Sequence, residues 1–107
     1  VREVEAWLLA DRKGMARFLG VPVADLPMKP DSLNDPKGTI VELARRSRQR
    51  GIREDVVPRP ASGRTVGPAF ASRMIEYANG PWCPDVAAEN SDSLARCLRR
   101  LREIAGT

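Results

Sequence analysis

Residues 1–11, VREVEAWLLAD, decide how the rest of the sequence is interpreted. Their apolar side chains Val4, Trp7 and Leu8 recur at the spacing of an α-helix. This pattern predicts a helix over residues 3–10 with one buried face. The first four residues also fit the end of a strand that runs into the helix, so the segment allows at most one strand edge.

The same segment contains three carboxylates. On the helix Glu5 lies between Leu8 and Leu9, and a charge among apolar side chains costs free energy unless a cation or hydrogen-bond donors satisfy it. Two arrangements remain open. In one, an arginine pairs with the acid and Asp11 caps the next helix. In the other, a divalent metal such as Mg²⁺ is bound by Glu5 and Asp11. Glu3 lies on the side of Glu5 only if the first residues are extended.

Local signals predict further helices. Asp11 and Gly20 are typical of a helix start and end. Asp35 followed by Pro36 is a strong helix start, and Gly51 is expected to end that helix. These helices cover residues 12–19, 36–49, 69–78 and 94–104, and single helical turns are expected at residues 52–58 and 86–87.

The last helix has the clearest apolar seam, with Leu94, Cys97, Leu98, Leu101 and Ile104 on one face. Ser91 or Ser93 is expected to cap it.

Proline-rich segments join these helices. Residues 21–36 contain four prolines, and residues 58–68, PRPASGRTVGP, cannot form regular structure. The sequence therefore predicts one mainly α-helical domain over residues 1–107, with about five helices.

Composition limits the possible functions. The chain has 107 residues and no histidine, which excludes histidine-based catalytic triads and histidine-ligated zinc. No apolar run is long enough to span a bilayer, so we expect no membrane contact and a cytoplasmic location. Two cysteines, Cys83 and Cys97, fit a reducing compartment, although one bridge between them remains open.

The net charge of +4 comes from arginine clusters. Arg45, Arg46 and Arg48 on the predicted helix 36–49 are candidates for contacts with a nucleic-acid backbone, and the alternative is a solvated helix face. Arg59 and Arg64 in the loop at residues 58–68 are candidates for binding an anion, and the alternative is a solvated loop.

Longer motifs suggest a family. REVEAWLLADRKGMARFLGV and LPMKPDSLNDPKGTIVELARRS together resemble a family of bacterial proteins of unknown function. The matching pattern is Glu-x-Glu-Ala-Trp-Leu-Leu-Ala-Asp at residues 3–11, then Pro30-Asp31, then Asp35-Pro36-Lys37. This family looks like a relative of the Toprim-like group, which includes Mg²⁺-dependent nucleases that act with ATPase partner proteins in phage defence.

The resemblance implies that the chain is the C-terminal, helical part of a larger α/β protein, with the usual first-strand Glu and Asp-x-Asp strand before residue 1. It implies that Glu3 or Glu5 is the acid that this segment contributes to a catalytic Mg²⁺ site, which this chain alone does not complete. The alternative function is a non-catalytic helical module that binds a protein partner or nucleic acid through arginine-rich faces.

Overall fold

The computed structural model describes residues 2–106, apart from the side chains of Arg2 and Glu3. Within this part the chain is mainly helical and contains no strand, so the strand alternative at the N-terminus is wrong from Arg2 onward. The elements are α1 (Arg2–Ala10), α2 (Arg12–Leu19), η1 (Val23–Asp25), η2 (Pro30–Ser32), α3 (Pro36–Arg45), α4 (Arg50–Val56), α5 (Phe70–Asn79), α6 (Pro84–Ala88) and α7 (Asp92–Ala105), where η1 and η2 are short 3₁₀ helices.

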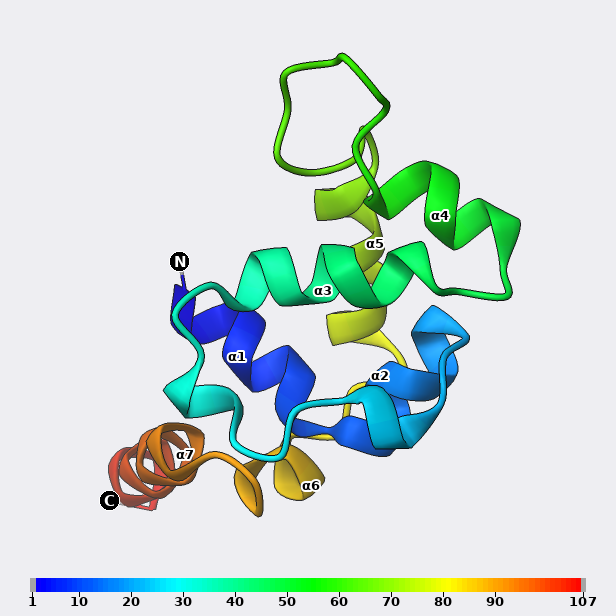
Figure 1. Cartoon of the computed structure of the whole chain (residues 1–107). Coiled ribbons are helices and arrows are strands. Elements are labelled where there is room, and N and C mark those ends of the chain that lie inside the picture. The colour runs from blue at the N-terminus through cyan, green and yellow to red at the C-terminus, as the bar shows by residue number, and fades with distance from the viewer. Residues whose placement is uncertain (1, 107) are drawn as a thin grey trace.

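The molecule is elongated, with extents of 51 × 26 × 25 Å. Helix α1 packs against α3, η2, α6 and α2. Figure 1 shows α3 crossing α1 and α5, with the loop before α5 at one end of the molecule and α7 at the other. No helix among the described residues has the length and apolar character needed to cross a bilayer.

The core forms around an apolar face of α1 that overlaps only in part with the face its periodicity predicts. Leu8 and Leu9 join Met15 and Leu19 of α2 and Ile40 of α3 in one buried cluster. Trp7, by contrast, is only half-buried, and Val4 is 46% exposed. The apolar face of α1 is therefore rotated from the predicted one toward Leu9.

The predicted caps are confirmed. The Asp11 carboxylate accepts a hydrogen bond from Gly14 N, and Gly20 ends α2 with φ of 74°. Asp35 accepts from Gly38 N at the start of α3, with Pro36 in the first turn. Ser91, rather than Ser93, caps α7 through Leu94 N.

The predicted end of α3 is wrong, because α3 stops at Arg45 and Gly51 lies inside α4. The cause is tertiary. Ser47 is buried, and its hydroxyl donates to Leu19 O while accepting from Gln49 N at 2.9 Å. This contact turns the backbone toward α2. It also makes α4 a separate helix, so that with α6 the described chain has seven α-helices instead of about five.

Asp31 of η2 fixes the start of α7. Its carboxylate accepts from Ser91 Oγ at 2.7 Å and from Ser93 N at 3.0 Å. Burial pushes the pKa of Asp31 upward, but the hydrogen bonds from Ser93 and Ser91, together with the charge of Arg96, outweigh it and leave that pKa lowered. Asp31 thus extends the capping of α7 across 60 residues of sequence.

Tyr77 of α5 occupies the centre of the core. It is fully buried, its ring lies 5.0 Å from that of Phe18, and its hydroxyl is 3.4 Å from Asp11 O. Burial, followed by the negative charge of Asp11, raises the pKa of Tyr77 far above its ordinary value. The folded state therefore holds the neutral phenol.

This gives an expected result in alkali. Because the pKa of Tyr77 is raised by folding, its contribution to stability is complete below about pH 10 and is lost as pH rises above that value. The chain has one tyrosine, so tyrosinate absorbance reports on this residue alone. We expect tyrosinate to appear together with the loss of helical circular dichroism. Ionisation near pH 10 with helicity intact would contradict the buried position.

Candidate nucleic-acid interface

The described acids of residues 1–11 do not form a cluster of carboxylates. Glu5 is 9% exposed, between the buried side chains of Leu8 and Leu9 as predicted, and it makes no hydrogen bond or ion pair with any described residue. The side chain of Glu3 lies outside the described residues. Among the described side chains, no group of three acids, histidines or cysteines is placed to bind a metal ion.

Asp11 is engaged by the protein itself. One carboxylate oxygen accepts from Gly14 N at 3.1 Å and the other from Cys83 N at 3.0 Å. The side chain is 4% exposed. It also lies six residues from Glu5, which places the two acids about 9 Å apart along a helix axis. The structure therefore gives Asp11 the capping role and separates it from Glu5.

Cys83 and Cys97 are free thiols, so the disulfide left open by the sequence does not form here. Cys83 is exposed in the loop before α6. Cys97 is half-buried on the seam of α7, as its spacing predicts.

The predicted arginines of α3 diverge. Arg45, in the last turn, pairs with Glu42 at 3.1 Å. Arg46 follows the helix and lies 3.8 Å from Asp25, and Arg48 lies in the turn before α4. They do not form one helix face, because α3 ends before two of them.

The turn after α3 instead joins the end of α2. Arg48 N donates to Gly20 O at 3.1 Å, and Ser47 Oγ donates to Leu19 O. The fit is close, since a Cβ placed on Gly20 would lie 2.9 Å from Gln49 Nε2. The exposed arginines of this turn are therefore held beside the last turn of α2.

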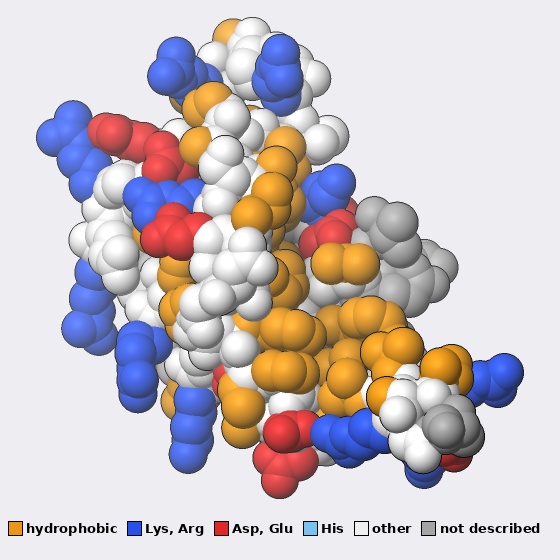
Figure 2. Space-filling view, turned by 180° about the vertical axis from the view of Figure 1, so that it is seen from behind, with side chains coloured by type: hydrophobic (Ala, Val, Ile, Leu, Met, Phe, Trp, Pro, Cys, Tyr) orange, Lys and Arg blue, Asp and Glu red, His pale blue; other side chains and the backbone are white. Residues whose placement is uncertain are grey.

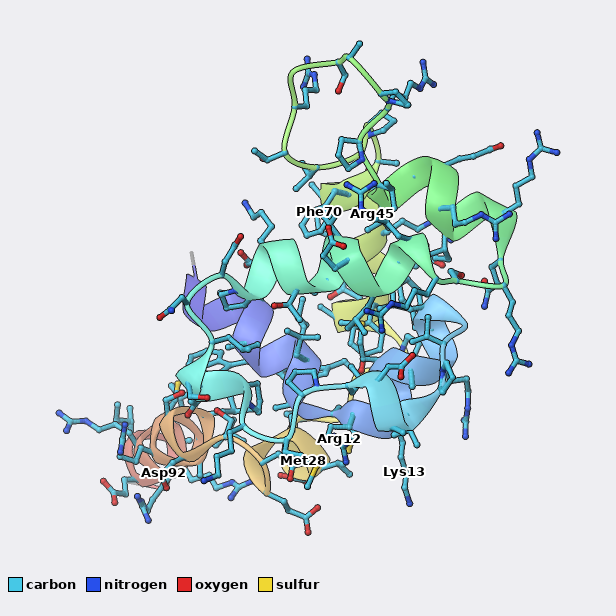
Figure 3. The ribbon with its side chains drawn as sticks, viewed as in Figure 1. Arg12, Lys13, Met28, Arg45, Phe70 and Asp92 are labelled. Carbon is cyan, nitrogen blue, oxygen red and sulfur yellow. The ribbon has the colours of Figure 1, made fainter. Side chains whose placement is uncertain are left out.

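Helix α2 has exposed cations of its own. Lys13 and Arg17 are four residues apart, on one face of the helix, and both are exposed. Figure 3 shows Lys13 of α2 pointing away from the body of the molecule. We use the name basic edge for the exposed cations of α2, of the α3–α4 turn and of the first residue of α4, which are Lys13, Arg17, Arg46, Arg48 and Arg50.

The basic edge is weakly neutralised. Arg50 pairs with Glu54 at 2.8 Å in a solvent-exposed contact, and the Arg46–Asp25 contact is long. Lys13, Arg17 and Arg48 form no ion pair within residues 2–106. Figure 2 shows Lys and Arg side chains following one another along this side of the molecule, at the left of the view.

A second group of cations lies on the loop between α4 and α5. Arg59 and Arg64 line one hollow of about 220 Å³, together with Ser62, Val66 and Pro68. Neither arginine pairs with a carboxylate of the described chain. The two arginines that the sequence predicts as anion-binding candidates therefore line the same hollow.

The sequence did not identify Lys13 and Arg17 as candidates for contacts with nucleic acid. Their i, i+4 spacing was visible, but nothing local placed α2 against residues 46–49. Comparison with other proteins adds no relative: no family model matches the chain, and neither a curated protein nor a solved structure does. The resemblance to the Toprim-like group stays a prediction.

Proposed function

We propose that this chain is a helical module that binds the phosphate backbone of double-stranded nucleic acid through its basic edge. The observation that supports the proposal is the docking of the α3–α4 turn onto the end of α2, through Ser47 and Arg48. It brings cations from segments 30 residues apart onto one surface.

The chemistry of the edge favours phosphates. Lysine and arginine side chains that neutralise phosphates release condensed counterions, which gives affinity without sequence preference. The free guanidinium of Arg48 can bind a phosphate through two parallel hydrogen bonds. The hollow at Arg59 and Arg64 offers one more phosphate contact of the same kind.

The edge favours a duplex over a single strand. Single-strand binding depends on exposed aromatic rings on which bases stack. The aromatic residue in α2 is Phe18, and it packs against the core and the ring of Tyr77 instead. The basic edge can therefore contact the phosphate backbone of a nucleic acid but cannot stack on its bases.

The test is duplex binding by a charge-neutral variant. Lys13→Gln, Arg17→Gln and Arg48→Gln together are expected to weaken binding of a labelled 20-base-pair DNA about 10- to 100-fold in low salt. The measurement is fluorescence anisotropy. Arg96→Gln, Arg99→Gln and Arg100→Gln remove the same charge from α7 and serve as the matched control. If both variants lose the same affinity for the DNA, binding depends only on the net charge of the protein, and the proposal is refuted.

A second candidate function is favoured by one observation: the side chain of Glu5 is mostly buried, and its carboxylate makes no hydrogen bond or ion pair with a described residue but retains some contact with solvent. In the Toprim-like reading, Glu5 supplies one Mg²⁺ ligand for phosphoryl chemistry and the other acids come from elsewhere in the protein. Its cofactor is Mg²⁺, and an ATPase is its partner.

This candidate predicts that the complete coding product cleaves DNA when Mg²⁺ is present. We expect Glu5→Gln to abolish cleavage while circular dichroism stays unchanged, because the amide fills the same space without the charge. Retained cleavage in the folded variant would remove Glu5 from the site. Glu89→Gln, the same change at an exposed acid outside the proposed sites, is the control.

A further inference from the structure

Helix α7 presents an apolar stripe that the rest of the described chain covers only in part. The α7 stripe consists of Leu94, Cys97, Leu98, Leu101 and Ile104. Leu94 is buried and Leu98 packs against the same small cluster, but Leu101 is 55% exposed. The rest of the described chain therefore covers the stripe only as far as Leu98.

The apolar surface continues from α7 onto α1. Val4 is exposed, and Trp7 and Trp82 are half-buried beside the start of the stripe. Figure 2 shows hydrophobic side chains gathered in one broad area that reaches the protruding end of the chain at the lower right. An exposed apolar area of this kind is typical of a protein interaction site.

The two indole rings are fixed before any partner arrives. Trp7 Nε1 donates to Ser93 Oγ at 2.9 Å, and Trp82 Nε1 donates to Trp7 O at 3.0 Å. Side chains that are already ordered lose little conformational entropy on binding. Rigid aromatic rings are therefore good anchors for a partner.

Charges border the stripe on both sides. At 100° per residue, Arg100 and Arg102 lie about 100° to either side of Leu101. Arg102 pairs with Asp85 at 2.8 Å in an exposed contact, and Arg100 has no ion pair in the described chain. The acids of α7, Asp92 and Glu103, lie on the opposite face. A bound partner would thus meet one arginine at each border, Arg100 without an ion pair and Arg102 in an exposed pair with Asp85.

The charges beside the α7 stripe indicate which kind of partner can bind it. A second copy of the chain would place the same arginines against each other, which is unfavourable. A helix with its own apolar stripe and with acids along both borders complements the surface. We propose that the α7 stripe, with Trp7 and Val4, is the docking site for an acidic amphipathic helix of a partner protein.

The proposal is independent of duplex binding, since none of its residues belongs to the basic edge. Its test uses two labelled helical peptides with leucines at i, i+4, i+7 and i+11. One peptide has glutamates along both borders of the leucine face, and the other has lysines at the same positions. Titration into the full chain is expected to show tighter binding of the glutamate peptide, by more than about tenfold.

Two variants make the test specific. Leu101→Asp is expected to weaken the glutamate peptide more than about tenfold, whereas Met28→Asp, at a residue 70% exposed elsewhere, leaves it unchanged. The double variant Arg100→Glu and Arg102→Glu is expected to reverse the preference between the peptides.

Three results would overturn the proposal. They are equal binding of both peptides, a dimer in sedimentation equilibrium that Leu101→Asp dissociates, and binding of phosphatidylserine vesicles in place of the peptide. Circular dichroism of each variant checks that the helices are retained.

Discussion

Asp11→Ala is expected to lower the free energy of unfolding by about 3 kcal/mol, because two backbone amides lose a charged acceptor at once. The carboxylate joins the start of α2 to the loop before α6, through Gly14 N and Cys83 N, and it is almost fully buried. After the substitution both N–H groups lack their partner. Urea denaturation followed by circular dichroism measures the change.

Asp35→Ala is the matched control for Asp11. Asp35 also caps a helix through the amide three residues on, at 3.0 Å, but it is exposed and accepts only that one bond. Its loss is expected to cost about 1 kcal/mol. Equal costs at the two sites would show that the contact with Cys83 N contributes nothing.

Leu9→Ala is expected to lower the free energy of unfolding by about 2–5 kcal/mol, through lost burial and the cavity that remains. Leu9 has no exposed surface and lies in the main cluster between α1, α2 and α3. A loss of this size is a large part of the stability of a small domain. Thermal and urea unfolding measure it.

Val4→Ala, in the same helix, separates burial from helix propensity. Because Val4 is exposed, its truncation is expected to change stability by less than about 0.5 kcal/mol. A small effect at Leu9, or a large one at Val4, would mean that α1 buries a different face.

What the sequence predicted well was local. The caps at Asp11 and Asp35 accept from the amide three residues on, and the structure contains both; for the last helix the sequence left Ser91 and Ser93 open, and Ser91 is the cap. The burial of Glu5 also followed from its position between two leucines. These features need no knowledge of which helices meet.

What the sequence did not predict depends on contacts between distant segments. The end of α3 is set by the Ser47 hydroxyl at Leu19 O, so the nearby glycine, Gly51, was a misleading signal. The basic edge depends on the same contact, because it places Arg48 beside α2. Likewise, periodicity identified the α7 stripe but could not show that Leu101 stays exposed.

The central claim is that the basic edge binds a duplex through phosphates. The most direct test is the slope of log affinity against log salt for duplex DNA. Five phosphate contacts predict a slope of about −4.5 for the wild-type chain, and removal of Lys13, Arg17 and Arg48 predicts a slope shallower by about 2.7. A wild-type slope near zero, or an unchanged slope in the triple variant, would contradict the account.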